Sequence, residues 1–456
     1  MRRLVWVIAL IAALFVGGWL YVSQSTWGRI YLPSGAGLTA KQACSLTFVS
    51  GLDPERAQTD YIDPLLGPAK SLISLEVDRS ARRTTSAIFG LFYRQTAVFR
   101  DGLGCTLVHD PDQFDADLTV PMPPPSALME IDTAWRDAHF DADALDAALD
   151  AAFTEDGRNT LAALVLHDGR LVAERYADGV DARSPLLGWS MTKSTAVTFA
   201  GVLVERGLID MRAEGLSPDL NAVDRPDITL DDMLRMTGGL DGFELNNGHD
   251  PNSEMLMTQA DMAAYAASRN KLHEPGEEWS YQSVNTILAG AAMEEFMGDT
   301  LTDRVETLRA WLFEPLGMNS VVFEPDQSGT LQWSSYMYAT AQDWARLGQL
   351  YLDNGRVGDA QIIPPNWLTY VGTPTVDWYG SGFWLNIEGL PADTVAMQGF
   401  QGQHGFVIPS EDLVIVRMGA TLGMESGAPE FGAAVIAAKR DTSDLEAPAE
   451  AQAAEG

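Results

Sequence analysis

The stretch TLAALVLHDGRLVAERYA, residues 160–177, decides which kind of sheet this chain builds. It contains two apolar runs, and His167-Asp168-Gly169-Arg170 lies between them. Asp-Gly between apolar runs strongly indicates a tight turn that joins two antiparallel strands. Immediately upstream, residues 140–153 have apolar side chains at helical spacing. The sequence therefore predicts a helix that leads into an antiparallel hairpin.

The remaining strands are expected near the other end of the chain, over 381–387, 404–409 and 413–420. The region between the early and late strands is mostly helical in pattern. The predicted helices follow Ser190 as far as Gly207 and then cover 229–236, 258–268, 285–297 and 340–355. The expected fold class is α/β of the α+β type, in which one antiparallel sheet is flanked by helices and a helical region is inserted.

A chain of 456 residues suggests two or three structural units. The proline-rich segment 120–126 is expected to be a linker. It separates an N-terminal extension, 23–130, from the sheet-forming domain, 131–440. The acidic, alanine-rich tail, 441–456, has the composition of a disordered segment.

The first 22 residues have the pattern of a membrane anchor or an export signal. Arg2 and Arg3 precede an uncharged run from Leu4 to Val22, which as a helix would be about 28 Å long, close to the thickness of a bilayer core. A secretory signal has a shorter apolar region and a small-residue cleavage site, of which residues 23–25 are a poor version. We favour an uncleaved anchor over a cleaved signal. The arginines would stay in the cytoplasm and place the rest of the chain on the extracytoplasmic (periplasmic) side.

Charge and cysteine content limit the partners. The formal net charge of −33 repels nucleic acid, so no nucleic-acid partner is expected.

The two cysteines, Cys44 and Cys105, lie beyond the predicted anchor, where a disulfide would persist, although two unpaired buried thiols are an alternative. No Cys/His spacing resembles a zinc site and no dinucleotide or phosphate-loop fingerprint occurs, so we expect neither metal nor cofactor.

The candidate chemistry lies in GWSMTKST, residues 188–195. Ser190 and Lys193 stand three residues apart at a predicted helix start, so the lysine amine can reach the serine hydroxyl. A serine hydroxyl becomes a good nucleophile only when a base takes its proton. The helix N-terminus favours the neutral amine and can stabilise an oxyanion beside Ser190. The alternative is that Ser190 only caps the helix and Lys193 is a solvated residue of the first turn.

The same spacing occurs again at Ser268 and Lys271. Ser268 ends a predicted helix, where the helix dipole is negative, and Pro275-Gly276 soon follow. This context favours Ser190 as the nucleophile.

Tyr281 is the candidate for a further acid/base. It lies between a Pro-Gly turn and a predicted helix, and a neighbouring lysine ammonium can lower the pKa of a phenol enough for it to act as a base. Ser283, two residues further on, is expected to face the same way. The alternative is that Tyr281 is a half-buried core residue.

Five segments stand out in chain order: GWSMTKS, LRMTGGL, PGEEWSYQSVNTILAG, SSYMYATAQDWARLGQLYLDNG and GFQGQHGFVIPSEDLVIVRMG. Together they resemble the β-lactamase-related serine hydrolases, which include 6-aminohexanoate-dimer hydrolase, class C β-lactamase-like esterases and D,D-peptidases. The resemblance covers roughly residues 130–440.

The resemblance implies a role for each candidate residue. Ser190 would be acylated by substrate, and Lys193 and Tyr281 would share the proton transfers, with Ser283 in the third position of the tyrosine element. The family's third element, usually Lys, His or Trp followed by one residue and Gly, corresponds to Phe400-Gln401-Gly402 on a late strand. The backbone N–H of Gln403 would then join that of Ser190 in an oxyanion hole.

Phe400 departs from the family pattern. A phenylalanine cannot hold a substrate carboxylate, which argues against penicillin or D-Ala-D-Ala recognition and suits a neutral ester or amide. His404 is a possible replacement for the missing cation. The expected function is an exported serine hydrolase that acts on a small ester or amide. The alternatives are a non-catalytic binding protein of the same fold, and a D,D-peptidase or β-lactamase.

Overall fold

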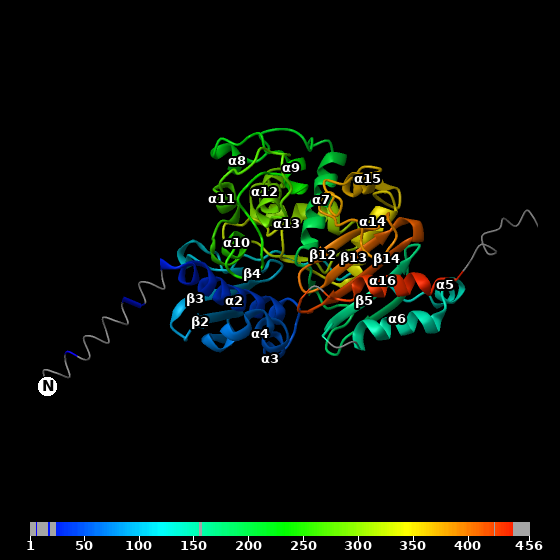
Figure 1. Ribbon diagram of the computed structural model, residues 1–456, viewed down its shortest axis with the longest axis horizontal. Coiled ribbons are helices and arrows are strands. Elements are labelled where there is room, and N and C mark those ends of the chain that lie inside the picture. The colour runs from blue at the N-terminus through cyan, green and yellow to red at the C-terminus, as the bar shows by residue number, and fades with distance from the viewer. Residues whose placement is uncertain (1–5, 7–16, 19–23, 155–156, 424, 441–456) are drawn as a thin grey trace, which may run out of the picture. The chain divides into compact units, whose positions relative to one another are not determined.

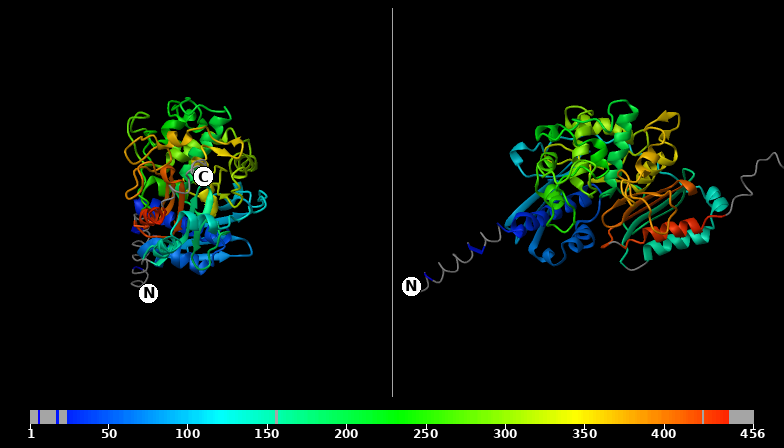
Figure 2. Two further views of the ribbon diagram at one scale, coloured as in Figure 1. Left: turned by 90° about the vertical axis from the view of Figure 1, so that its right-hand side faces the viewer. Right: turned by 45° about the horizontal axis from the view of Figure 1, so that its top comes forward.

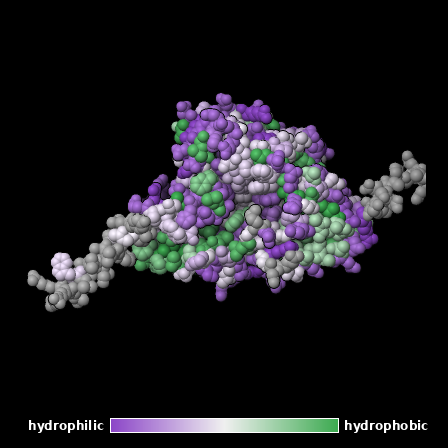
Figure 3. Space-filling model, viewed as in Figure 1, coloured by the Kyte–Doolittle hydropathy of each residue, from purple (hydrophilic) through white to green (hydrophobic). Residues whose placement is uncertain are grey.

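The computed structural model describes residues 6, 17–18, 24–154, 157–423 and 425–440 (Figure 1). The predicted anchor over 1–22 and the predicted disordered tail over 441–456 therefore lie outside the described residues, apart from three positions of the anchor. Within the described ranges, no helix combines the length and the apolar character needed to cross a bilayer. Polar side chains cover much of the face seen in Figure 3, as the acidic composition leads one to expect.

The chain divides into two compact units, each of which is discontinuous in sequence. The first comprises Met1–Pro121, Arg212–Val305 and Phe323–Gln332, and the second comprises Met122–Met211, Glu306–Val322 and Trp333–Gly456.

The second unit contains the predicted antiparallel sheet. Its strand order is β12-β13-β14-β5-β6, and every neighbouring pair is antiparallel. The early hairpin thus pairs with the late strands through β5 and β14, which confirms the expected fold class. The five strands are β5 (Thr160–His167), β6 (Arg170–Tyr176), β12 (Val395–Gly399), β13 (Gln403–Ile408) and β14 (Leu413–Gly419).

One predicted strand is wrong. Residues 381–387 form no strand and make only isolated bridges, from Trp384 to Tyr379 and from Trp384 to Ala396. The backbone of Gly382 has a φ of 67°, a left-handed conformation that an extended strand does not contain. The strand at this edge of the sheet is β12, which the sequence analysis did not find.

Helices cover the sheet of the second unit (Figures 1 and 2). Helices α6 (Ala142–Thr154) and α16 (Ala428–Ala437) share one apolar core with β5, β13 and β14. Helix α14 (Ala341–Leu352) packs on the same three strands. Gly348 of this helix leaves room for Val414, because a Cβ atom at position 348 would lie only 2.7 Å from a Val414 methyl group. The remaining elements of this unit are α5 (Thr133–His139), β7 (Leu186–Leu187), α7 (Met191–Glu205), a π-helix (Arg309–Phe313), β9 (Met337–Ala339), β10 (Arg356–Val357), β11 (Ala360–Gln361), α15 (Trp367–Gly372) and a 3₁₀ turn (Pro409–Glu411), while β8 (Val322–Phe323) crosses the unit boundary.

The first unit combines helices with a second sheet. Strands β1 (Ile73–Asp78), β2 (Arg83–Ile88), β3 (Phe92–Arg100) and β4 (Gly104–Leu107) form an antiparallel sheet in that order, and α2 (Leu32–Phe48) packs on it. The inserted helices are α8 (Pro218–Ala222), α9 (Leu230–Leu234), α10 (Pro251–Thr258), α11 (Met262–Ala267), α12 (Ser283–Glu294) and α13 (Leu301–Leu308), the last of which crosses the unit boundary. Short helical turns cover Trp27–Tyr31, α3 (Pro54–Arg56), Ala57–Ile62, α4 (Asp63–Leu66), Gly67–Leu72 and Pro111–Gln113.

The structure differs from the expected domain boundaries. Residues 23–130 do not form a unit of their own, because α2 packs on α10 of the inserted helical region as well as on its own sheet. Gly37 of α2 lies so close to the Met257 carbonyl that a Cβ atom would be 2.6 Å from it. In the same unit, Cys44 and Cys105 form a disulfide with a Cα–Cα distance of 6.1 Å.

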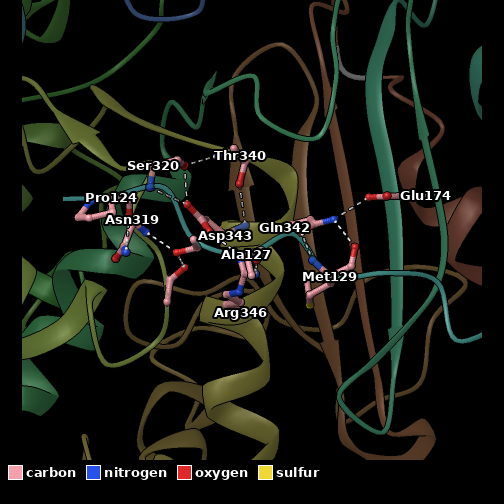
Figure 4. Close-up of polar contacts among 12 residues, drawn as sticks. Pro124, Ala127, Met129, Glu174, Asn319, Ser320, Thr340, Gln342, Asp343 and Arg346 are labelled. Atoms are coloured by element: carbon pink, nitrogen blue, oxygen red, sulfur yellow. Dashed lines mark hydrogen bonds and ion pairs between the residues drawn. The ribbon is translucent and has the colours of Figure 1, made fainter. Parts of the chain in front are cut away.

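The residues from 122 onward, which include most of the proline-rich stretch, are bound within the second unit, so this stretch is not a free linker (Figure 4). Asn319 donates to the Pro124 carbonyl at 2.8 Å, and Arg346 donates to the Ala127 carbonyl at 3.0 Å. Gln342 accepts from the Met129 N–H at 2.8 Å. These contacts fix residues 122–130 along α14, and the unit boundary accordingly falls at residue 121.

Candidate active site

Ser190 lies at the N-terminus of α7, in a short turn that its neighbours hold rigidly. The Gly188 N–H donates to the Met337 carbonyl at 3.0 Å, and a Cβ atom at Gly188 would be 2.2 Å from the Trp344 ring. Trp189 has a φ of 47°, an unfavourable left-handed conformation for a bulky residue. Backbone strain of this kind persists only where the surroundings enforce it, and it is concentrated at functional sites.

Lys193 is directed at Ser190. Its Nζ atom lies 3.0 Å from Ser190 Oγ and donates to the Ser334 carbonyl at 3.1 Å, while the residue is only 1% exposed. The side chain of Ser190 makes no helix-capping hydrogen bond. Neither part of the alternative interpretation therefore holds, because Ser190 is not a side-chain cap and Lys193 is not solvated.

The second Ser-x-x-Lys pair has different partners. Lys271 forms ion pairs with Asp227 at 3.0 Å and Glu274 at 2.6 Å, and Ser268 Oγ donates to the Tyr265 carbonyl at 2.7 Å. Each side chain is thus occupied by a structural contact.

Tyr281 and Ser283 belong to the first unit and differ from each other in surroundings. Tyr281 is half-buried just before α12, whereas Ser283 is fully buried as the first residue of that helix. The N–H and Oγ of Ser283 donate to Glu244 Oε2 at 3.1 and 2.7 Å. A carboxylate at a helix N-terminus is a favourable pairing. The Ser283 side chain is therefore used in a buried hydrogen bond, whereas Tyr281 is partly exposed. The sequence analysis did not identify Glu244 as the partner of Ser283.

Phe400, Gln401 and Gly402 form the turn between β12 and β13, in which Gly399 pairs with Gln403. The sequence analysis placed this triplet on a strand, and the structure corrects this. Gln401 and Gly402 have φ values of 61° and 79°, which a tight hairpin turn requires.

This turn lies beside the Ser190 turn within the second unit. Trp189 Nε1 donates to Gln401 Oε1 at 3.0 Å, and the Trp189 and Phe400 rings meet edge to face with centroids 5.6 Å apart. Gly399 approaches the Gly188 carbonyl so closely that a Cβ atom would be 2.2 Å from it. Phe400 keeps 37% of its surface exposed.

His404 follows on β13, and its Nε2 lies 2.9 Å from Ser426 Oγ. Burial, assisted by the charge of Arg417, lowers the pKa of His404 to about 3. The ring is therefore neutral near pH 7 and does not supply the positive charge that Phe400 lacks. In the parts of the chain that the structure describes, no cluster of His, Cys, Asp and Glu has the arrangement of a metal site.

Comparisons with known proteins identify the family and the fold. The family model described as Beta-lactamase matches residues 145–439. The chain is 25% identical over 300 residues to the 6-aminohexanoate-dimer hydrolase of Paenarthrobacter ureafaciens, and the match covers 57% of this chain and 72% of the relative.

Two solved structures share the fold. A penicillin-binding protein homolog from Caulobacter crescentus has a TM-score of 0.53 at 18% identity, covering 65% of this chain and 96% of its own. A family VIII carboxylesterase has a TM-score of 0.51 at 17% identity, covering 64% and 96%. The chain belongs to the β-lactamase-related serine hydrolase family.

Proposed function

We propose that this protein hydrolyses a small ester or amide through an acyl-enzyme formed on Ser190. The observation that carries the proposal is the 3.0 Å contact between Lys193 Nζ and Ser190 Oγ at the start of α7. A buried amine within hydrogen-bond reach of a serine hydroxyl is the arrangement that activates a serine nucleophile.

The proposed reaction has two halves. Lys193 takes the proton of Ser190 as Oγ attacks the substrate carbonyl, and the Ser190 N–H at the start of α7 stabilises the oxyanion that forms. Gln403, which the resemblance offers as the second donor, pairs with Gly399 in the hairpin, so its N–H faces β12. Tyr281, sharing the proton transfers with Lys193, protonates the leaving alcohol or amine. Water then attacks the acyl-enzyme with the same groups acting in reverse, which releases the acid and restores Ser190.

Phe400 supports a neutral substrate. It is partly exposed beside Trp189, and its ring offers an apolar contact where a cation would bind a carboxylate. The similar proteins include a 6-aminohexanoate-dimer hydrolase and a carboxylesterase, whose names correspond to an amide and an ester substrate.

We further propose that the enzyme acts outside the cytoplasm and is held at the membrane by residues 1–22. The uncharged run from Leu4 to Val22 behind two arginines supports an anchor. The Cys44–Cys105 disulfide supports an oxidising compartment.

Covalent labelling tests the nucleophile. After treatment with a fluorophosphonate probe, we expect the intact mass of the protein to rise by one adduct, and we expect no adduct on Ser190→Ala. The matched control is Ser268→Ala, which removes the serine of the other Ser-x-x-Lys pair and should label like the wild type. Labelling that survives in Ser190→Ala would refute the proposal, and folded wild type that resists the probe would favour a binding protein.

Tyr281→Phe tests the second acid/base. General acid/base catalysis contributes about 10²- to 10⁴-fold, so hydrolysis of a p-nitrophenyl ester should slow by roughly that factor. The fold should be retained, because only the phenolic oxygen is lost. Tyr265→Phe is a suitable control, since its hydroxyl binds Glu254 at 2.9 Å on α10. Equal effects of the two changes on turnover would argue against a role for Tyr281.

A further inference from the structure

The turn between β2 and β3 in the first unit exposes two large apolar side chains. Phe89 is 66% exposed and Leu91 is 79% exposed, and only Gly90 lies between them. Single apolar residues are common on protein surfaces, but two at the tip of one hairpin form an apolar projection. Packing within the protein does not account for it, because both side chains remain mostly in contact with water.

The backbone of this turn does not favour a phenylalanine either. The Leu91 N–H donates to the Ile88 carbonyl at 3.1 Å. Phe89 and Gly90, the two residues between them, have φ values of 51° and 72°. Two positive φ angles are the pattern of a type I′ turn, in which Asn, Asp or Gly is preferred at the central positions. A bulky apolar residue at position 89 is therefore unfavourable for the backbone and also exposed, which points to a role outside the protein's own fold.

The turn lies at the end of the sheet where α2 begins (Figure 1). Two contacts between α2 and β2 give the direction. Ser86 Oγ donates to the Ala36 carbonyl at 2.5 Å, and Thr84 Oγ1 donates to the Ala40 carbonyl at 2.6 Å. The lower-numbered residues of α2 thus lie beside the higher-numbered residues of β2. The N-terminal end of α2 and the turn at 89–91 are therefore at the same end of the sheet.

The predicted membrane anchor precedes this end of α2. Only residues 23–31 separate Val22, the last residue of the apolar run, from Leu32, the first residue of α2. A connection of this length spans at most about 35 Å when extended and about 15 Å when helical. An anchor in the bilayer would keep the turn near the membrane surface and raise its effective concentration there.

The side chains around this end of the first unit suit a membrane interface. Trp27 is 56% exposed and meets Tyr31 edge to face, with ring centroids 4.6 Å apart. Tryptophan and tyrosine are enriched where membrane meets water. Arg29 and Arg94 are exposed, and neither forms an ion pair among the described residues. On a chain with a net charge of −33, unpaired cations at this place complement the negative surface of a bilayer that contains anionic lipids.

We infer that the turn at Phe89–Leu91 is a second membrane contact: its apolar tip inserts into an anionic bilayer beside the anchor and fixes how the first unit lies on the membrane. The inference rests on the proposed anchor and goes beyond the proposed hydrolysis. Two side chains alone bind a membrane weakly, but the anchor makes their insertion an intramolecular step.

Fluorescence of the full chain in liposomes tests the inference. Both cysteines of the chain form the disulfide, so Leu91→Cys introduces a single thiol that can carry an environment-sensitive NBD fluorophore. The liposomes contain phosphatidylcholine and phosphatidylglycerol, with or without doxyl groups on the acyl chains. Ala81→Cys is the matched control, because position 81 is exposed in the β1–β2 turn at the opposite end of the same strands, about 20 Å away.

We expect doxyl lipids to quench the label at position 91 about threefold or more strongly than the label at position 81, since apolar residues at an interface lie about 5–10 Å deep. Liposomes of phosphatidylcholine alone should give weaker quenching of the label at position 91, because the attraction to Arg29 and Arg94 is lost.

Phe89→Asn separates a membrane role from a structural one. In the double variant Phe89→Asn/Leu91→Cys, quenching should fall by about half, since one of the two inserted side chains is gone. The thermal unfolding midpoint should stay or rise, because asparagine suits this turn. A lower midpoint with unchanged quenching would show that Phe89 serves the fold alone, contrary to the inference.

Two further outcomes would overturn the inference. One is equal quenching of the labels at positions 81 and 91. The other is a label at position 91 that responds to protein concentration but not to doxyl lipid, which would indicate contact with a second copy of the chain. Protein that does not float with liposomes would refute the proposed anchor and the inference with it, whereas floating protein with an unquenched label at position 91 would refute the inference alone.

Discussion

Lys193→Met is expected to reduce labelling and ester hydrolysis by about 10²- to 10⁴-fold, the range of general base catalysis. The amine is the group that the structure places at Ser190 Oγ, 3.0 Å away. Methionine has a similar length and suits a buried position, so the loss should reflect chemistry more than packing.

Lys193→Arg separates a base from a mere positive charge. Arginine retains the charge but is not deprotonated in proteins, so it cannot accept the Ser190 proton. We expect it to be as slow as Lys193→Met. Lys439→Met, which breaks the half-exposed ion pair with Glu411, is the control and should leave both rates unchanged.

The labelling and hydrolysis rates of these variants can be compared only if each variant is folded like the wild type. Thermal unfolding of each protein should show a cooperative transition, since the Ser334 carbonyl loses only one donor in Lys193→Met. Substantial labelling of folded Lys193→Arg would show that Lys193 acts by charge alone and would exclude the proposed proton transfer.

The contact between Ser190 and Lys193 could be predicted because it is local. Three residues along a helix determine it, and helix geometry is regular. The contact of Lys193 with Ser334 could not be predicted, since it joins residues 141 positions apart and its acceptor is a backbone carbonyl.

The same difference between local and distant contacts explains the errors in the fold. The hairpin at Asp168-Gly169 is encoded locally and was predicted. Strand β12 has no alternating pattern and ends in glycine, so its place in the sheet depends on pairing with β13. The N-terminal extension was expected to stand alone because its proline-rich boundary is visible, whereas its contacts with the inserted helices are not.

The extension also forms a buried ion pair with a residue of the first unit that lies far away in the sequence. Lys41 of α2 and Glu324 are 1% and 0% exposed, and Lys41 Nζ lies 2.7 Å from the carboxylate. Glu324 also accepts from the Cys105 N–H at 2.6 Å and from Ser45 Oγ at 2.8 Å, and Lys41 donates to the Cys105 carbonyl. The pair lies beside the disulfide and joins residues outside the family match to residue 324 inside it.

Lys41→Met is expected to lower the free energy of unfolding by about 3–5 kcal/mol, the cost of leaving one member of a buried ion pair without its partner. Burial alone raises the pKa of Glu324, and the Lys41 charge opposes that shift. Urea unfolding with the disulfide intact measures the loss.

The double variant Lys41→Met/Glu324→Met should recover most of the lost free energy of unfolding, because removing both charges leaves no uncompensated group in the core. A loss below about 1 kcal/mol in the single variant, the size of a surface ion pair, would show that the contact does not hold the extension in place. A large loss that the double variant reverses would show that the cost comes from an uncompensated buried charge, at a position where the extension packs against Glu324 of the first unit.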